Sequence, residues 1–412
     1  MARILGVVAS STSKSQAKII GYNNLVNADY SATSIAVSSD KKTFYQSGGD
    51  GTNSYIMAIK NTDGSIVWQK SINYGAYSNI ITTLPDGSLH MFPNDPAKYG
   101  VSINFNAADG SINTQYRYGG SMGWYGIPKK SDGNNEWYFP GYNGSVNGIL
   151  ARLNSSFVLQ NAYRVINDQY STSCASSAVN DANDRVIFGG YCRGGYKGWL
   201  MSSNRGLTSQ YFSKQIYDNE GNVLPFYADD DGNFYATYRL RPGSYYTGNL
   251  TKFDGSCNAI WTATLDTGSY NDWNYATYNT EDNCIYVVGW NYYAKYNNSG
   301  TLQYQRRVTS NTGSFHFTGG TLAGSYLYMA GVGPGDYGFS LVLPTDGSGT
   351  GSYSVGSYTI TIAAGTGTVG NTAPTIYASP LGSGTIDSSN FNRQVTDYTN
   401  SNASYTYTKT LI

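Results

Sequence analysis

The stretch Asn61-Thr62-Asp63-Gly64-Ser65-Ile66-Val67-Trp68 contains the motif that organises this chain. An Asp-Gly turn followed at once by strand-like residues predicts two antiparallel strands joined by a tight turn. Related turns recur along the whole sequence, at a spacing of about 45–50 residues that is typical of structural repeats. They lie at 61–65, 107–111, 154–156, 203–206, 253–256, 297–300 and 345–348.

A second series of turns keeps the same phase as the first. It lies at 39–42, 85–87, 131–133, 180–183, 231–233, 281–283 and 323–325. Two turns in each repeat, separated by short stretches in which apolar and polar residues alternate, predict four antiparallel strands. Repeats of this length and content are typical of propeller blades. We therefore predict an all-β fold, a seven-bladed β-propeller of four-stranded antiparallel blades, with little helix.

The repeats also predict where the propeller begins and ends. We place it at 29–365, after an N-terminal segment at 1–28 that acts as an anchor or edge strand and before a C-terminal extension at 366–412. Each blade is expected to be complete within its own stretch of chain, although residues 16–28 could add an edge strand to the last blade. The extension ends in alternating residues at 405–412, which indicate a strand for docking or oligomerisation whose partner could lie in another subunit. The blades are expected at 29–75, 76–120, 121–168, 169–218, 219–269, 270–313 and 314–365.

Composition excludes several classes of function. The 412 residues carry a formal net charge of zero, and only 13% are charged, so no overall field favours nucleic acid or an anionic membrane. No stretch approaches the roughly 20 apolar residues of a membrane span. The apolar run at 4–9 is shorter than the 7–15 residues usual in a signal peptide, so we expect it to stay in the mature chain. Cys174 and Cys192 fall in one blade and could pair, but buried free thiols are the favoured interpretation.

The turns and the longer loops are expected on opposite faces of the disc. Both turn series lie at the same end of antiparallel strands, and they carry about half of the acidic residues. The other face carries loops rich in aromatic residues and Arg, and flat amphipathic rings suit the recognition of sugars and proteins. Filling of space between blades is the alternative for any single ring. The candidate ligand-binding residues, all in blades 4 to 6, are Tyr191, Arg193, Tyr196, Arg239, Arg241, Tyr245, Tyr246, Trp290, Tyr292 and Tyr293.

Groups with catalytic or metal-binding chemistry are few. The run Asp229-Asp230-Asp231 is rich in carboxylates, but it occupies a turn position and lacks the spaced ligands of a calcium loop. The two histidines, His90 and His316, are too few for a three-His metal site and are expected in the core or at its rim. Paired carboxylates for glycoside hydrolysis remain open. We expect no catalytic residues, no metal and no cofactor.

The repeats resemble those of quinoprotein-like propellers. The resemblance is clearest where a Trp follows the turn, at Trp68 and Trp261, while other repeats carry Tyr116, Tyr211 or Tyr304 nearby. It implies the propeller architecture over 29–365. The vicinal Cys pair and the ligand set of quinone-dependent dehydrogenases have no counterpart in the sequence, so the resemblance does not imply their activity.

The opening residues Arg3-Ile4-Leu5-Gly6-Val7-Val8-Ala9-Ser10-Ser11 resemble the start of many tailed-phage virion proteins, especially fibre and tail-associated ones. The resemblance implies a non-enzymatic virion protein, a tail fibre or surface appendage, that binds a host receptor or glycan. Its terminal segments would contact other virion proteins, and it could form homo-oligomers. The alternatives are a secreted bacterial lectin-like adhesin and a glycan-degrading propeller enzyme.

Overall fold

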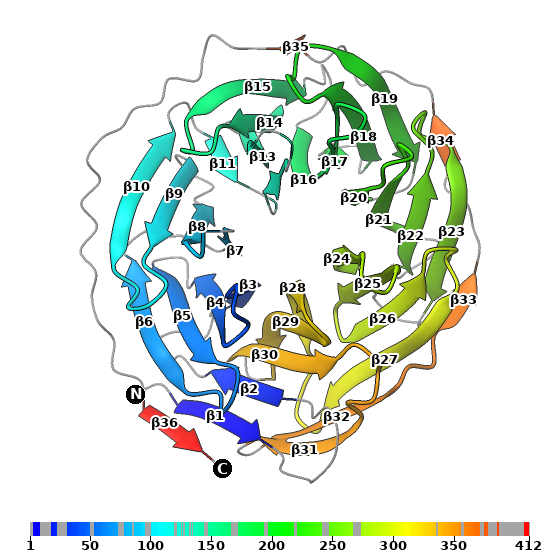
Figure 1. Cartoon of the computed structure of the whole chain (residues 1–412). Helices are drawn as coiled ribbons and strands as arrows, with labels where there is room; N and C mark the ends of the chain where they lie inside the picture. The colour runs from blue at the N-terminus through cyan, green and yellow to red at the C-terminus, as the bar shows by residue number, and fades with distance from the viewer. Residues whose placement is uncertain are drawn as a thin grey trace.

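The computed structural model describes residues 3–8, 18–22, 31–49, 53–72, 78–84, 86–94, 100–118, 122–124, 126, 128–131, 133, 135–143, 147–165, 172–192, 197–217, 221–240, 247–266, 273–334, 337–355, 358–370, 375–377, 385–386 and 408–411. Strands and turns make up this part of the chain, with no helix in it. The strands form seven sheets, which stand round a central axis (Figure 1). The predicted fold, a seven-bladed β-propeller with antiparallel blades, is confirmed.

Six blades are built in the same way, from consecutive antiparallel strands that run from the axis to the rim. In blade 3 the innermost position is divided between two short strands, which both pair with the next strand of the sheet. The strands of the six blades are, in order, β3 (Ser31–Val37), β4 (Thr43–Gly49), β5 (Ser54–Lys60) and β6 (Ile66–Ile72); β7 (Ser78–Thr83), β8 (Leu89–Asn94), β9 (Gly100–Phe105) and β10 (Ile112–Tyr118); β11 (Met122–Trp124), β12 (Lys129–Lys130), β13 (Trp137–Asn143), β14 (Asn147–Leu153) and β15 (Leu159–Val165); β16 (Thr172–Asn180), β17 (Arg185–Cys192), β18 (Lys197–Asn204) and β19 (Gln210–Tyr217); β20 (Val223–Ala228), β21 (Phe234–Leu240), β22 (Thr247–Phe253) and β23 (Ala259–Asp266); and β24 (Trp273–Asn279), β25 (Cys284–Gly289), β26 (Tyr292–Asn297) and β27 (Leu302–Ser310).

Blade 7 is the exception, because its outer strand comes from the start of the chain. After β28 (His316–Ala323), β29 (Tyr326–Gly333) and β30 (Tyr337–Pro344), the fourth strand is β2 (Lys18–Tyr22), paired antiparallel with β30. The expectation that this blade is complete within 314–365 is therefore wrong, and the alternative edge strand from 16–28 is the arrangement found. A ring closed by strands from both ends of its sequence resists opening at that seam.

The strands expected to finish blade 7 join blade 6 instead. After the 345–348 turn, β31 (Gly351–Val355) and β32 (Tyr358–Ala364) form a hairpin, and β32 pairs with β27 on the rim of blade 6. The turn signal is local and correctly predicts a change of direction. The edge on which the next strand pairs depends on which rim is vacant, and β2 already occupies the rim of blade 7.

The C-terminal extension pairs with the rim of the ring within the same chain. Three short strands add antiparallel to β23, β19 and β15, and so pass blades 5, 4 and 3 in reverse order. The last strand pairs with β1 (Arg3–Val8), the strand outside β2. We call these four strands the belt: β33 (Thr368–Gly370), β34 (Thr375–Tyr377), β35 (Thr385–Ile386) and β36 (Thr408–Leu411). The C-terminal strand thus pairs within its own chain and does not need another subunit for a partner.

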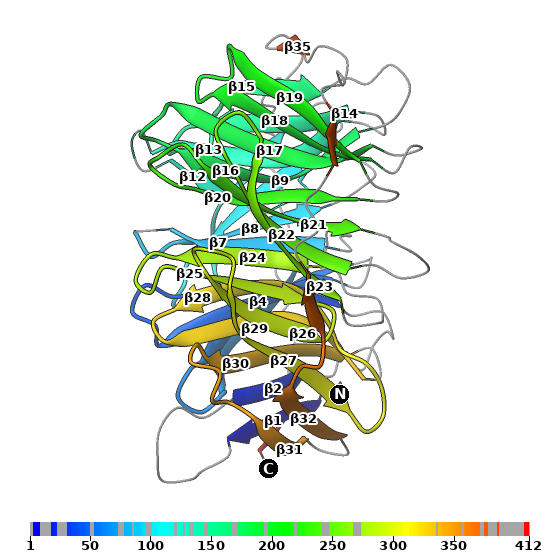
Figure 2. The same cartoon turned by 90° about the vertical axis from the view of Figure 1, so that its right-hand side faces the viewer.

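The repeated turns are held by a local hydrogen bond. In six turns of the first series, the Asp or Asn side chain accepts the N–H of the residue two positions later, as Asp63 does from Ser65 at 2.8 Å and Asp109 from Ser111 at 2.9 Å. Asn154 and Asn297 make the same bond with Ser156 and Ser299. In blades 1 to 6 these turns join the third and fourth strands. They share one face of the disc with the second series, seen edge-on in Figure 2.

Each turn of this series places one residue in the left-handed region of φ. At Gly110, Gly300 and Gly347 the outer strand of the preceding blade packs an aromatic ring against the turn. Trp68 packs in this way on Gly110, and its Nε1 donates to Ala107 O at 2.8 Å. The same position is occupied by Trp261 on Gly300 and by Tyr304 on Gly347. The seven left-handed residues are Gly64, Gly110, Phe157, Leu207, Cys257, Gly300 and Gly347.

In blades 3, 4 and 5 the left-handed residue is apolar and buried, and it fills the space itself. The strand registers show which residues hold the position that Trp68 holds in blade 1. It is Thr114 in blade 2, next to the turn of Phe157, and Asn161 in blade 3, next to the turn of Leu207. Asn161 still donates from Nδ2 to a turn carbonyl, Gly206 O, at 3.1 Å. Before Cys257 the position belongs to Phe212, not to the neighbouring Tyr211. At the first two of these seams the turn residue replaces the ring of the preceding blade, whereas the small Cys257 packs in one cluster with Phe212.

The hydrophobic core is a ring of clusters, one between each pair of neighbouring blades. The cluster between blades 7 and 1 contains Ile35 and Phe44 from blade 1 and Tyr328 and Val342 from blade 7. The other six clusters continue round the ring in the same way. Cys174, Cys257 and Cys284 are free and buried, which confirms the interpretation of these thiols and excludes a Cys174–Cys192 disulfide. The seam between blades 7 and 1 is therefore packed like the others.

Candidate functional site

Three of the predicted ligand-binding residues lie at equivalent places on the loop face. Tyr191, Arg239 and Trp290 stand at or just after the loop-face ends of β17, β21 and β25, the second strands of blades 4, 5 and 6. All three side chains are half-buried. Arg193, Tyr196, Arg241, Tyr245 and Tyr246 lie outside the described residues. The structure therefore brings three of the candidates to one face.

Two other candidates belong to the core. We expected Tyr292 and Tyr293 in an exposed loop, but the loop is only the two-residue turn Trp290–Asn291, and both tyrosines lie in β26. Tyr292 is 1% exposed and Tyr293 is 0% exposed. Successive residues of a strand point to opposite faces, so Tyr292 packs between blades 5 and 6 and Tyr293 between blades 6 and 7. A ligand on the loop face does not reach either ring.

Trp290 is held in place by a cluster from blades 6 and 7. Its ring stacks on His316 with a centroid distance of 4.4 Å and an interplanar angle of 18°. Nδ2 of Asn274 lies 3.2 Å from Nε2 of His316 and donates to Phe317 O at 2.8 Å. The N–H of Phe317 donates to Trp290 O at 2.9 Å. We expected His316 in the core or at its rim and did not expect Asn274 here, because nothing in the sequence indicates that these residues meet.

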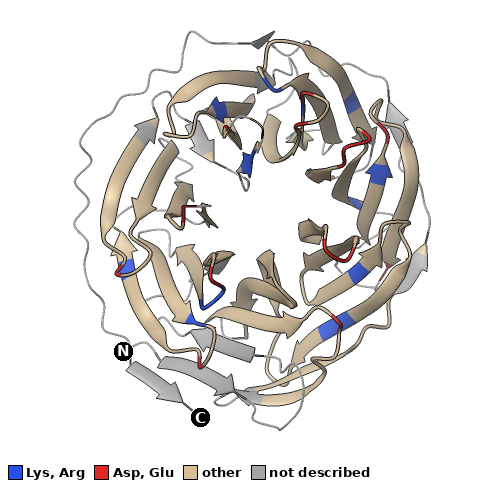
Figure 3. Cartoon of the chain, in the orientation of Figure 1, with Lys and Arg blue, Asp and Glu red and all other residues tan. Residues whose placement is uncertain are grey.

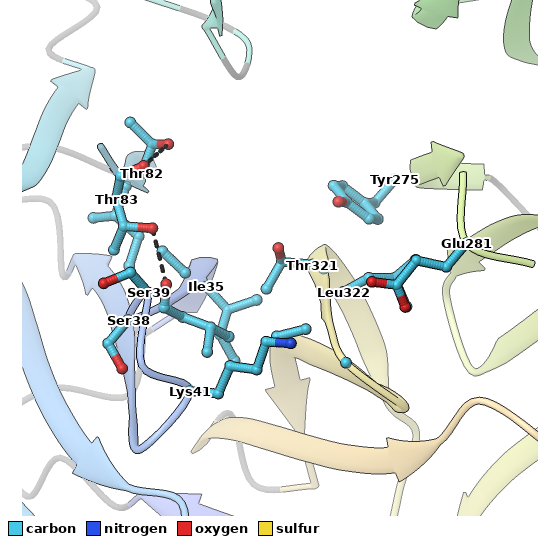
Figure 4. A pocket seen from close by; sticks show the side chains of 16 residues that line it. Ile35, Ser38, Ser39, Lys41, Thr82, Thr83, Tyr275, Glu281, Thr321 and Leu322 are labelled. Atoms are coloured by element: carbon cyan, nitrogen blue, oxygen red, sulfur yellow. Dashed lines mark hydrogen bonds between the residues drawn. The ribbon is translucent and has the colours of Figure 1, made fainter. Parts of the chain in front are cut away.

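A hollow of about 400 Å³ lies on the opposite face, at the turn-side mouth of the central channel (Figure 4). It is lined by the inner strands of blades 6, 7, 1 and 2, namely β24, β28, β3 and β7, and by the turns that follow some of them. Lys41 and Glu281 contribute the charges at its exposed edge. Figure 3 shows other acidic residues in turns around this mouth. We call this feature the channel hollow.

The wall of the channel hollow is rich in hydroxyl groups. Ser39, Thr82, Thr83, Thr321 and Tyr275 all line it. Burial raises the pKa of the Tyr275 phenol to about 12, against the effect of hydrogen bonds with Thr277 and Thr321. The phenol therefore stays protonated and able to donate at neutral pH.

Tyr275 owes its position to a glycine in the next blade. A methyl group on Gly320 would lie 2.8 Å from Cδ1 of Tyr275, which is closer than carbon atoms pack. The ring therefore lies directly on the Gly320 backbone at the wall of the hollow. A larger residue at 320 would displace it.

A second, smaller hollow of about 240 Å³ runs over the seam between blades 7 and 1. It is lined by Asn61, Tyr326 and Tyr328, and it shares Lys41, Ala323 and Gly324 with the channel hollow. Asn61 Nδ2 donates to Lys41 O and, across the seam, to the hydroxyl of Tyr328 at 2.9 Å. The two hollows thus meet at Lys41, and we call this second one the seam hollow.

Lys41 has an unusual backbone for its residue type. The turn between the first and second strands places one residue in the left-handed region in every blade, and in six blades this residue is Gly, Asn or Asp. Those types tolerate a positive φ best, whereas other side chains pay a steric cost. In blade 1 the position belongs to Lys41, with φ of 59°. The seven residues are Lys41, Gly87, Asn135, Asp184, Gly232, Asn283 and Gly324.

We expected 39–42 to be one more turn of the series and did not single out Lys41. An alignment of the second turn series could have revealed it, because the other six turns place Gly, Asn or Asp where this turn has Lys. The side chain lies over the equivalent glycine of blade 7, since a methyl group on Gly324 would lie 3.5 Å from Nζ of Lys41. Figure 4 shows it reaching from blade 1 towards blade 7.

The acidic turn in blade 5 has the structure of an ordinary turn. Asp229 accepts the N–H of Asn233 at 2.8 Å through Oδ1, and Lys252 Nζ lies 3.1 Å from its Oδ2. The interpretation of this run as turn chemistry is confirmed. Within the described ranges, His, Cys, Asp and Glu side chains form no group of three or more that could hold a metal ion. No helix long and apolar enough to cross a membrane occurs in the same ranges.

Known proteins resemble this chain in fold. No protein-family model matches it, and no curated protein is similar in sequence. Among solved structures, hydrazine synthase of Kuenenia stuttgartiensis has a TM-score of 0.54 and 11% identity, over 73% of this chain and 92% of the other. The Cps50 (Swd1) β-propeller domain of Myceliophteria thermophila has a TM-score of 0.52 and 8% identity, over 76% and 96%.

The propeller of Dos1 has a TM-score of 0.50 and 10% identity, over 83% of this chain and 92% of that one. Likeness at such identities establishes a shared propeller architecture, and propellers host many unrelated functions. This chain is thus a seven-bladed β-propeller with four-stranded blades.

Proposed function

We propose that this protein is a non-enzymatic recognition protein of a phage particle, a tail fibre or surface appendage. Its propeller displays a surface that binds a host receptor or glycan. The observation that carries the proposal is the alignment of Tyr191, Arg239 and Trp290 on one face of three consecutive blades, each half-buried. Half-buried aromatic and Arg side chains on a rigid scaffold suit recognition, because little side-chain entropy is lost on binding.

The surroundings of Trp290 support this role. Its indole is stacked on His316, so one ring face is already covered and the orientation is set before a ligand arrives. The C–H face of a sugar packs well on a pre-oriented aromatic ring, since preorganisation lowers the cost of binding. The nearby Asn274 offers an amide that hydrogen bonds to neighbouring groups.

The arrangement of the termini supports attachment to a particle. Strands β1 and β36, from opposite ends of the sequence, lie side by side on the rim of blade 7 (Figure 1). Contacts to other virion proteins, and to further copies of this chain, are proposed at this rim. The loop face of blades 4 to 6 then stays available to the host.

Two experiments test the proposal. Mass spectrometry of density-purified particles from the source culture should find the protein at a fixed copy number relative to the major capsid protein. Absence from particles, with the protein in the medium, would contradict the virion assignment and favour the secreted lectin-like adhesin. Activity on glycan would favour the enzyme.

Adsorption of the purified protein to host cells tests the surface itself. Trp290→Ala should weaken adsorption at least tenfold, because the stacked indole is lost. Tyr211→Ala is the matched control, since Tyr211 is 48% exposed and lies on the outer strand of blade 4, away from the loop face. If both variants fold and adsorb like the wild type, the surface assignment is wrong.

A further inference from the structure

The channel hollow on the turn face combines features that an ordinary gap between strands lacks. It has a cation and a carboxylate at its exposed edge and hydroxyl groups on its wall. Its volume of about 400 Å³ falls within the usual range of small-molecule sites, roughly 300–1,000 Å³. The hollow is on the opposite side of the disc from Trp290, so nothing in the proposed receptor surface accounts for it.

Lys41 is the residue that indicates binding. The left-handed position that it occupies is filled in the other six blades by Gly, Asn or Asp, which adopt it more easily. Backbone strain of this kind is often found at functional sites, because the side chain is retained for what it contacts. The Lys41 side chain extends over Gly324 to the place where the channel hollow and the seam hollow meet. A strained residue thus delivers an ammonium group to a concave surface.

From these features we propose that the channel hollow binds a small acidic sugar, with its carboxylate on Lys41 and its hydroxyl groups on Glu281 and the threonines of the wall. The seam hollow, lined in part by Tyr326, would accept a further sugar unit attached to the first. This inference does not rest on the loop-face surface described above.

Charge argues for a carboxylate rather than a phosphate. Phosphate sites are usually built from Arg side chains or several converging backbone N–H groups, whereas this hollow offers one Lys. Glu281 lines the same hollow and would repel a dianion. A singly charged carboxylate satisfies Lys41 at one end, and sugar hydroxyl groups donate to Glu281 at the other. Figure 4 shows the two charged side chains on opposite sides of the inner strand of blade 7.

Titration calorimetry of the full chain with D-galacturonate and D-galactose tests the site, because these sugars differ at the carboxylate. The wild type should bind galacturonate at least tenfold more tightly. Lys41→Asn should abolish that preference without lowering Tm, since Asn135 and Asn283 occupy the equivalent position in blades 3 and 6. Lys41→Arg should keep it.

Each remaining outcome bears directly on the proposal. Equal affinity for the two sugars, or galacturonate binding that survives Lys41→Asn, would overturn it. Acetate that binds as tightly as galacturonate would also overturn it, because the hydroxyl groups would then contribute nothing. Trp290→Ala should leave galacturonate binding unchanged, so failure of this site and failure of the receptor surface are distinguished.

Discussion

Blade 2 contains two glycines that separate backbone strain from packing between blades. Gly87 and Gly110 lie in the two turns of the same face, with φ of 84° and 71°. In both turns an Asp side chain accepts the N–H of the Ser two positions later, at 2.9 Å. A methyl group on Gly110 would lie 2.5 Å from Cε3 of Trp68, while one on Gly87 would meet nothing within 4 Å. The pair is therefore a matched test of the aromatic docking that joins blades 1 and 2.

Alanine at Gly87 should cost only the left-handed backbone term, about 1–2 kcal/mol. Alanine at Gly110 should cost that term plus the displacement of a packed ring, about 1–3 kcal/mol more. Unfolding entropy of about 2.1 cal/mol/K per residue over 412 residues makes 1 kcal/mol worth roughly 1 °C of Tm. We expect Tm to fall by roughly 1–2 °C for Gly87→Ala and roughly 2–6 °C for Gly110→Ala.

Calorimetric melting of both variants measures this difference, and a double mutant identifies its source. In the Gly110→Ala background, Trp68→Ala should cost less than it does in the wild type, because the clash is relieved. Equal falls in Tm for the two glycine variants would refute the docking argument. So would strictly additive effects in the double mutant.

Three further predictions concern other parts of the ring. Burial lowers the pKa of His90 from 6.5 to about 4, against the opposing effect of the Asp86 charge. As the pH falls, the unfolded chain takes up this proton before the folded one, so the free energy of unfolding should fall by up to about 3 kcal/mol between pH 6.5 and pH 4. Urea melts at the two pH values should show a smaller loss for His90→Gln. Removing residues 366–412 uncovers the edges of β15, β19 and β23, so light scattering should detect self-association of the shortened chain. A monodisperse monomer would contradict the idea that the belt protects these edges. Lys41→Asn should raise stability by up to about 1 kcal/mol in urea melts, because Asn tolerates the left-handed region better, and a loss of stability would show that Lys41 is not strained.

Local interactions allowed much of the fold to be predicted from the sequence. The turn in which Asp63 accepts the N–H of Ser65 depends on residues two positions apart. Such a turn can therefore be recognised from the sequence motif alone. Two turns in each repeat then determine four strands, and seven repeats determine the ring. The placement of Tyr191, Arg239 and Trp290 on one face also follows from strand direction alone.

Features that depend on distant parts of the chain were decided only by the tertiary structure. The rim of blade 7 takes β2 rather than β31, because edge pairing depends on which rim is vacant and not on the turn before the strand. Tyr292 and Tyr293 are buried because the turn before them contains only two residues. The hollows around Lys41 exist because ring closure brings blade 1 against blade 7, where Asn61 and Tyr328, 267 residues apart, share a hydrogen bond. Sequence periodicity determines the blades, whereas closure of the ring determines what meets at the seam.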